Sequence, residues 1–219
     1  MGEKTTVLHR FAPINKPEHM DAYLKLFPRE VALREKYGFH TFHASLDKGD
    51  MIILTWLYTY EGEDSMEDAL KKLMADPEKI ELDKEAAPHI HTNYRIRKVD
   101  LIFQEELQDL AAIKDKTLVM RRYSIKRSGW DEHCENMKKI IPLRTEYGFV
   151  PVFEVGDREE SMFTWAFRFE GKWEDFRKLQ YPYYTDPRRV PLDANNNNLT
   201  DIVINPAQEI FIPGFTVKA

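Results

Sequence analysis

Histidine is unevenly spread along this chain, and its ring nitrogens are the groups best suited to acid–base chemistry near neutral pH. Six of the seven histidines fall in the first half of the sequence: His9, His19, His40, His43, His89 and His91. A neutral imidazole in an apolar pocket can remove a proton from a phenol or an acidic C–H group. Two or three imidazoles can also bind a divalent metal. The first half therefore predicts either general acid–base catalysis or a metal site.

The second half of the chain resembles the first but has other residues in place of most of the histidines. LREKYGFHTFH at 33–43 recurs as LRTEYGFVPVF at 143–153, so that His40 and His43 correspond to Val150 and Phe153. Three further matches keep the same order: VLHRF (7–11) with VMRRY (119–123), TWLYTYEG (55–62) with TWAFRFEG (164–171), and Asp76-Pro77 with Asp186-Pro187. An unpaired polar group in an apolar setting costs about 1–3 kcal/mol. This cost, repeated in one copy only, indicates a function for its histidines.

Each copy has the pattern of a β-α-β-β-α-β unit. In the first copy, strand-like residues at 5–12 precede a helix that ends at Gly38, and strands follow at 39–46 and 51–60. We expect an α+β fold built from two tandem ferredoxin-like repeats, over residues 1–110 and 116–219. The stretch 181–200, with three prolines and the run Asn195–Asn198, predicts a long irregular loop.

Composition excludes several classes of protein. A net charge of −5 argues against a general nucleic-acid binder. The sequence has no apolar run of about 18 residues, so it predicts no membrane span. Cys134 is the single cysteine, which excludes an internal disulfide and suits a reducing compartment, so we expect a cytoplasmic protein.

The chain resembles a tandem member of the dimeric α+β barrel superfamily and is most similar to its NIPSNAP-like branch. The resemblance rests on VMRRYSIKRSGWDEH (119–133), the YGF segments, the TW-aromatic strands and the Asp-Pro pairs. It implies a pseudo-dimeric barrel made by one chain, with a pocket between two sheets and a possible further homodimer. Arg121 and Tyr123 match the arginine and aromatic residue usual in NIPSNAP-like first strands, whereas the first copy departs from them with His9 and Phe11.

Strand alternation within this fold gives a set of candidate site residues. His9 and Arg121 would face each other across the cavity, and we expect His40 rather than His43 to point inward unless a bulge intervenes. The expected catalytic residues are His9, His40, His43, Arg121 and Tyr58. The expected substrate-binding residues are Trp56, Tyr60, His89, His91, Tyr94, Tyr123, Trp165 and Phe167.

Three functions follow from these residues. We expect first a cofactor-independent lyase, isomerase or cyclase in which histidine acts as acid and base on a small aromatic or phenolic substrate. The alternatives are a cofactor-free or metal-dependent monooxygenase, with a divalent metal held by histidines of the first repeat, and a non-catalytic protein that binds a small ligand. Haem is suggested by fold analogy alone.

Overall fold

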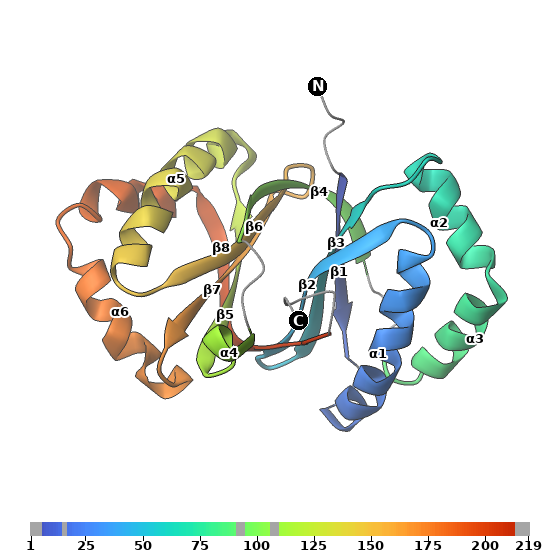
Figure 1. Ribbon diagram of the computed structural model, residues 1–219. Coiled ribbons are helices and arrows are strands. Elements are labelled where there is room, and N and C mark those ends of the chain that lie inside the picture. The colour runs from blue at the N-terminus through green and yellow to red at the C-terminus, as the bar shows by residue number, and fades with distance from the viewer. Residues whose placement is uncertain (1–5, 15–16, 91–94, 106–109, 213–219) are drawn as a thin grey trace. The chain divides into compact units, whose positions relative to one another are not determined.

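The computed structural model describes residues 6–14, 17–90, 95–105 and 110–212. The first half contains β1 (Thr6–Pro13), η1 (Pro17–His19), α1 (Met20–Glu35), β2 (Phe39–Lys48), β3 (Ile52–Tyr60), α2 (Met66–Ala75), α3 (Pro77–Ala86) and β4 (Arg95–Gln104) (Figure 1). The second half contains α4 (Leu110–Ile113), β5 (Lys116–Ile125), η2 (Arg127–Gly129), α5 (Trp130–Glu146), β6 (Val150–Asp157), β7 (Met162–Glu170), η3 (Trp173–Asp175), α6 (Phe176–Tyr184), η4 (Val190–Asn198) and β8 (Leu199–Glu209). This mixed order of strands and helices confirms the predicted α+β class.

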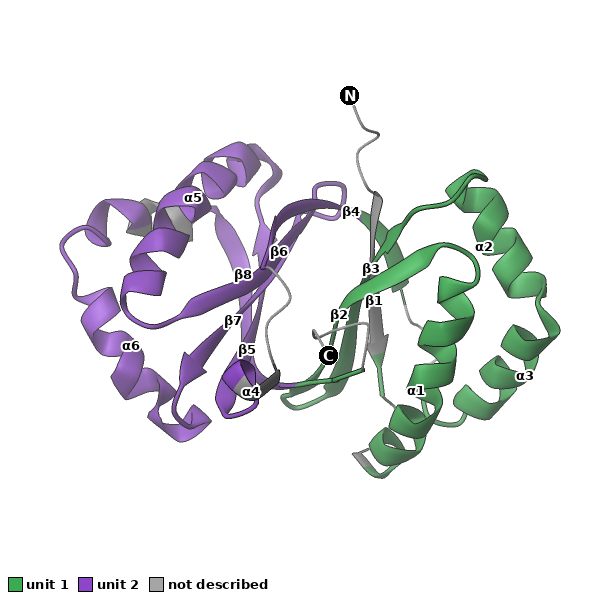
Figure 2. Ribbon diagram, viewed as in Figure 1, with its two compact units in different colours: residues 1–98, 209–219 green, residues 99–208 purple. Residues whose placement is uncertain are grey.

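The chain forms two compact units (Figure 2). Unit 1 comprises residues 1–98 and 209–219, and unit 2 comprises residues 99–208. The units therefore divide within β4 and β8, whereas the sequence places a boundary in the connector after residue 110. The origin of the two units as tandem repeats stays a prediction.

In unit 1, an antiparallel sheet with the strand order β1-β3-β2 packs one face against helices. Tyr23 and Phe27 of α1 are fully buried, and the Phe27 ring lies 4.7 Å from the ring of Trp56 on β3. Leu73 of α2 and Leu82 of α3 belong to the same core. Burial of a side chain of this size stabilises the fold by roughly 1.5–3 kcal/mol.

Unit 2 has an antiparallel sheet with the order β8-β5-β7-β6-β4, in which β4 contributes residues from Asp100 onward. Its core lies between this sheet and the helices α5 and α6. His133 of α5 is fully buried, with its ring 4.8 Å from that of Phe163 on β7. Phe176 of α6 packs on Phe167 of β7, with 5.9 Å between the ring centroids and an angle of 31° between the ring planes.

The two units repeat one set of polar contacts where the first helix meets the second strand. Gly38 and Gly148 have φ angles of +81° and +82°, the left-handed conformation that glycine adopts without strain. The hydroxyl of the preceding tyrosine donates to an aspartate at 2.7 Å in both units, from Tyr37 to Asp76 and from Tyr147 to Asp186. These contacts join the end of α1 to the aspartate that follows α2 in unit 1, and the end of α5 to the aspartate that follows α6 in unit 2.

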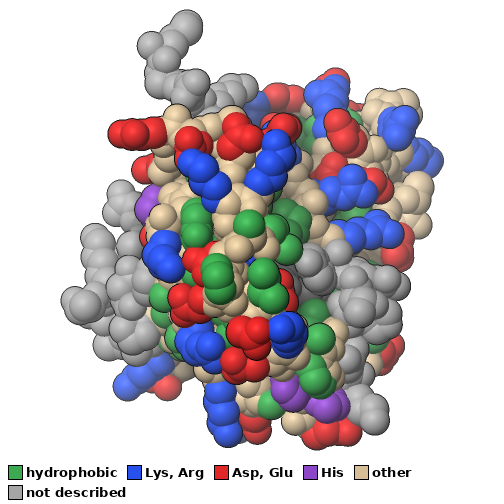
Figure 3. All heavy atoms as spheres, turned by 90° about the vertical axis from the view of Figure 1, so that its right-hand side faces the viewer, with side chains coloured by type: hydrophobic (Ala, Val, Ile, Leu, Met, Phe, Trp, Pro, Cys, Tyr) green, Lys and Arg blue, Asp and Glu red, His purple; other side chains and the backbone are tan. Residues whose placement is uncertain are grey.

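The helical face of unit 1 has an ordinary charged surface. Figure 3 shows acidic and basic side chains interspersed over this face, with scattered apolar groups between them. Many of these charges form ion pairs within or between neighbouring helices, as in Arg29–Glu85, Lys36–Asp76, Lys71–Asp68 and Lys84–Glu81. Among the helices in the described part of the chain, none is both long and apolar enough to cross a bilayer.

Candidate functional site

The aromatic stripes of both units face the helices, and this corrects the expected orientation of the site. Trp56 and Tyr58 belong to the core that α1 closes, and Trp165 and Phe167 belong to the core beneath α5 and α6. Strand alternation separates two faces of a sheet but does not say which of them meets a helix. The prediction that these rings point into a space bounded by two bare sheets was therefore wrong.

Unit 2 contains a pocket of about 260 Å³ between its sheet and its helices. Its walls come from β5, β7 and β8 on one side and from α5, α6 and the segment after α6 on the other. The lining residues are Arg121, Tyr123, Met137, Ile140, Arg144, Trp165, Tyr183, Tyr184, Arg189, Leu199, Ile202 and Ile204. Three predicted residues, Arg121, Tyr123 and Trp165, are thus brought together. Here they meet Arg144 of α5 and, from the stretch that the sequence predicts as a loop, Tyr183, Tyr184 and Arg189.

Three guanidinium groups converge on this pocket. Arg121, Arg144 and Arg189 are only 5%, 2% and 6% exposed. The Arg144 guanidinium lies 4.6 Å from the ring centroid of Tyr183 and donates to the hydroxyl of Tyr184 at 3.2 Å. Arg121 lies 5.5 Å from the ring of Trp165. Rings of this kind stabilise a cation by about 0.5–2 kcal/mol, whereas a buried charge that lacks an opposite charge costs about 3–5 kcal/mol.

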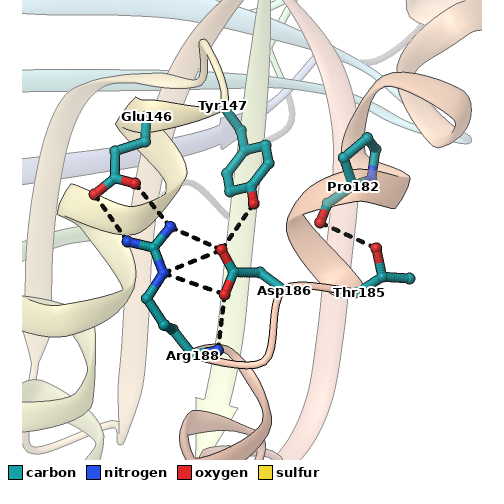
Figure 4. Close-up of polar contacts among 6 residues, drawn as sticks. All are labelled: Glu146, Tyr147, Pro182, Thr185, Asp186 and Arg188. Atoms are coloured by element: carbon teal, nitrogen blue, oxygen red, sulfur yellow. Dashed lines mark hydrogen bonds and ion pairs between the residues drawn. The ribbon is translucent and has the colours of Figure 1, made fainter.

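A polar network holds the segment that carries Arg189 (Figure 4). The Asp186 carboxylate accepts from the backbone N–H of Arg188 at 2.7 Å and from the hydroxyl of Tyr147. The Arg188 guanidinium donates to both Asp186 and Glu146, at 2.8 Å to each. Hydrogen bonds from Arg188 and Tyr147 hold the pKa of Asp186 well below its usual range. This network connects the segment after α6 to the end of α5. Its Arg188 immediately precedes Arg189, so the network fixes the backbone that carries Arg189.

Burial and the neighbouring cations act against each other at Tyr183 and Tyr184, and the net pKa shifts of the two tyrosines have opposite signs. Burial alone would raise the pKa of Tyr184, but Arg121 and Arg144 outweigh it and lower that pKa below its ordinary value. Burial dominates at Tyr183 and raises its pKa. Burial and the neighbouring Arg121 lower the pKa of Arg144, which nevertheless stays protonated because arginine does not lose its proton in proteins. Tyr184 is therefore the lining side chain best able to exchange a proton.

The histidines of unit 1 bind different partners. A bulge in β2 between Thr41 and His43 changes the alternation, so His40 and His43 lie on one face. His40 is half-exposed and pairs with Glu35 at 2.6 Å, while buried His43 contacts the Ser45 hydroxyl at 3.0 Å. Nδ1 of His89 lies within hydrogen-bond distance of Nδ1 of His19, at 2.9 Å. Within the described residues, no group of three or more histidine, cysteine or acidic side chains is placed to hold a metal.

The remaining predicted residues lie in several places. Trp56 donates to the Thr41 hydroxyl at 2.9 Å, Tyr58 is buried beside it, and the hydroxyl of Tyr60 donates to the backbone of Asp64. Phe167 is buried beneath Arg144, with 4.8 Å between the guanidinium and the ring. His91, Tyr94 and the side chain of His9 lie outside the described part of the structure. The catalytic roles assigned to the predicted residues stay predictions.

The sequence interpretation missed Arg144, Arg189 and Tyr184, although two of them left a readable signal. Arg144 lies in the repeated LR-x-x-YGF segment, at the position that corresponds to Arg34 of the first copy. Arg189 lies two residues after Asp186-Pro187, where the first copy has Lys79 two residues after Asp76-Pro77. The composition of 181–200 predicts an irregular loop and so gives no signal for Tyr184 and Arg189, whereas in the structure α6 extends to Tyr184 and η4 begins at Val190.

Neither a family model nor a curated protein matches this sequence. Solved structures do match its fold. A candidate monooxygenase from Fusobacterium nucleatum subsp. nucleatum has a TM-score of 0.62 at 12% identity, with 96% of this chain and 94% of that chain covered. A candidate monooxygenase from Lactobacillus acidophilus NCFM has a TM-score of 0.61 at 7% identity, covering 94% and 95%. An anthrone oxidase-like protein has a TM-score of 0.60 at 14% identity, covering 96% and 95%. The chain thus shares the fold of dimeric α+β barrel proteins.

The expectation of a cofactor-independent protein is corrected by further structural matches. They include a haem-binding protein from Thermus thermophilus, with a TM-score of 0.45 at 15% identity, and a chlorite dismutase from Candidatus Nitrospira defluvii, with a TM-score of 0.47 at 11% identity. Each covers more than nine-tenths of this chain. The expectation that this chain needs no cofactor is therefore not carried forward, while at TM-scores below 0.5 these matches identify no cofactor for it.

The pocket of unit 2 does not fit haem. Haem iron is usually held by histidine, cysteine, methionine with histidine, or tyrosine, and of these sets the lining residues described above offer tyrosine alone, from side chains that already contact the buried arginines. The pocket, at about 260 Å³, is also smaller than the roughly 300–1,000 Å³ of sites for drug-sized ligands. No step in the chemistry below therefore passes through haem.

Proposed function

We propose that the protein is an enzyme of the monooxygenase type that acts on a small, flat aromatic compound in the pocket of unit 2. The observation that carries this proposal is the pocket itself, in which aromatic rings and buried guanidinium groups surround a space suited to one or two fused rings. The fold shared with candidate monooxygenases and with an anthrone oxidase-like protein supports the reaction class. The histidine-based lyase is not carried forward, because the described histidines lie outside this pocket.

The lining residues suit the activation of a phenolic ring. The combined positive charge of the three buried guanidinium groups would stabilise the phenolate, the form in which such a ring is richest in electrons. Tyr184, with its lowered pKa, would accept and return the proton. Trp165 would stack on the ring and keep it flat against β7. Monooxygenation inserts one oxygen atom of dioxygen into the substrate and reduces the other to water, with two electrons from the substrate or a reductant.

The test measures dioxygen uptake by the purified protein with catechol, 1-naphthol and 4-hydroxybenzoate, with and without NADH as reductant. We expect uptake with at least one phenol, and isotopic oxygen from labelled dioxygen in the product. Arg144→Gln should reduce the rate at least tenfold. Arg158→Gln, which alters an exposed arginine paired with Asp131, should leave the rate unchanged. Uptake that is absent with every phenol, or unaffected by Arg144→Gln, would contradict the proposal.

A second function is the binding of an aromatic ligand without catalysis. One observation favours binding without catalysis. The described lining residues include no histidine or carboxylate, so Tyr184 is the one group among them with a lowered pKa that could exchange a proton. Tight binding of a phenol that is recovered unchanged, with no dioxygen uptake, would favour this function.

The assignment to the NIPSNAP-like branch, the cytoplasmic location and the possible homodimer belong with this proposal. They rest on the sequence resemblance, the single cysteine and the composition. Size-exclusion chromatography with light scattering would measure the oligomeric state directly.

A further inference from the structure

We propose that the ligand of the unit 2 pocket is an aromatic carboxylate, and that unit 1 contains the corresponding site closed by a carboxylate of its own, that of Glu30. This inference rests on the proposed function for its pocket and deepens it by naming the substrate class. It is carried by the exchange of the Glu30 carboxylate for Ile140 beside a buried arginine that packs on a tryptophan in both units.

In unit 1, Glu30 lies between two buried cations. It forms an ion pair with Arg34, one helical turn later on α1. It forms a second ion pair with Lys79 of α3, with 3.6 Å between Oε1 of Glu30 and Nζ of Lys79. Glu30, Arg34 and Lys79 are 1%, 4% and 2% exposed. The Arg34 guanidinium also lies 4.4 Å from the ring centroid of Trp56. Unit 1 thus has a guanidinium packed on a tryptophan, with its charge balanced by an internal carboxylate.

In unit 2, the cations are present but the carboxylate is replaced. Arg144 corresponds to Arg34, Arg189 to Lys79 and Trp165 to Trp56, while Ile140 takes the place of Glu30. Ile140 lines the pocket, and the lining residues that the structure describes include no aspartate or glutamate. A further cation, Arg121, is added by β5. The pocket therefore collects positive charge at the point where unit 1 holds a carboxylate.

The unused hydrogen-bond donors of the pocket indicate the same ligand. Nη1 of Arg144, Nε of Arg121 and Nε1 of Trp165 are buried without a hydrogen-bond partner. In unit 1, the corresponding indole donates to Thr41, a position that is Pro151 in unit 2. Buried polar groups are almost always hydrogen-bonded, so these donors require acceptors from outside the protein. A carboxylate supplies acceptors only, and its planar geometry suits guanidinium groups.

The walls of the pocket require the carboxylate to be attached to a ring. Tyr123 and Trp165 on the sheet and Tyr183 on α6 surround the cations with aromatic faces. Met137 and Ile204 complete an apolar lining. Inorganic anions would satisfy the donors but leave these surfaces uncovered, whereas a benzoate-like molecule satisfies both.

The test compares benzoate with benzamide, which has the same shape without the charge, by isothermal titration in a buffer free of other anions that bind arginine. We expect benzoate to bind at least tenfold more tightly than benzamide and than inorganic phosphate. Ile140→Glu copies the internal carboxylate of unit 1 and should weaken benzoate binding at least tenfold with little effect on benzamide. Ile140→Gln, similar in size but uncharged, should retain most of the preference for benzoate.

Equal binding of benzoate and benzamide, or benzoate binding unaffected by Ile140→Glu, would overturn the proposal. Phosphate binding as tight as that of benzoate would overturn its aromatic part. If Ile140→Glu does not fold, as judged by near-ultraviolet circular dichroism, Arg144→Gln replaces it and should abolish the preference for benzoate. If the natural protein prefers benzoate to benzamide but takes up no dioxygen with any phenol, the proposed function alone is contradicted. If it takes up dioxygen but shows no preference for benzoate, this inference alone is contradicted.

Discussion

Glu30 and Arg34 form a buried ion pair across one turn of α1, and the corresponding turn of α5 places Ile140 before Arg144. The same scaffold therefore holds a neutralised arginine in one unit and an arginine without an adjacent carboxylate in the other. Because a buried charge destabilises a protein unless it is compensated, the difference should be measurable in stability as well as in binding.

The two arginines should respond oppositely to replacement by leucine. Arg34→Leu leaves the Glu30 carboxylate buried with a weakened set of partners, so the free energy of unfolding should fall by about 3 kcal/mol or more. Arg144→Leu removes a cation that costs stability, so the free energy of unfolding should stay constant or rise by about 1 kcal/mol, while benzoate binding is lost. Urea denaturation of both variants without added ligand tests this pair. A loss of stability in Arg144→Leu as large as that in Arg34→Leu would contradict it.

Glu154 should make stability depend on pH near neutrality. Burial raises the pKa of this carboxyl on β6 to about 7 from an ordinary 4.5. The folded state then holds a proton that the unfolded state has released, so stability should fall as pH rises from about 4.5 to 7 and level off above. At about 1.4 kcal/mol per pKa unit, this loss is on the order of 3 kcal/mol. Thermal unfolding across this range should show the slope in the natural protein, and Glu154→Gln should remove that component of it.

Tyr183 and Tyr184 should titrate on opposite sides of the ordinary tyrosine pKa of about 10. Near-ultraviolet absorbance reports phenolate formation during a titration with base. We expect an early component, a rise in absorbance at a pH below that of the other tyrosines, which Tyr184→Phe removes and Tyr183→Phe retains. Arg144→Gln should shift this component to higher pH, because the guanidinium is one of the charges that lower the pKa. An early component that survives Tyr184→Phe would assign it to another tyrosine.

The network around Asp186 should be needed to position Arg189. Asp186→Asn loses the ion pair with Arg188 and weakens the link to Tyr147, so benzoate binding should weaken several-fold. Since the pKa of Asp186 is depressed in the folded state, its contribution to stability is present above the unfolded pKa of about 4 and lost as pH falls below it. Asp76→Asn removes the matching aspartate of unit 1 and serves as the control, because it should lower stability without changing benzoate binding.

Local sequence patterns determined much of this structure in advance. Alternation, the glycines at positions 38 and 148, and the Asp-Pro pairs each act within a few residues, so the order of strands and helices could be predicted. The contacts of Tyr37 and Tyr147 with aspartates about 40 residues later could not be predicted from the sequence, although both partners lie in segments that match between the halves.

The site was harder to predict because it depends on which face of each strand meets a helix. Arg121, Tyr123 and Trp165 were identified, yet they were assigned to the opposite face. The bulge before His43 reverses the alternation in β2, and a one-residue irregularity of this kind leaves no distinctive residue pattern. The exchange of Glu30 for Ile140 is visible in the sequence, but it becomes informative only when both are known to lie beside a buried arginine.

The central claim, that the pocket of unit 2 binds an aromatic carboxylate through its arginines, is tested most directly by a crystal structure of the protein with benzoate. We expect the carboxylate oxygens within about 2.7–3.2 Å of nitrogens of Arg121 and Arg144, with the ring against Trp165. A benzoate found elsewhere, or one in this pocket with its carboxylate turned away from both arginines, would contradict the claim.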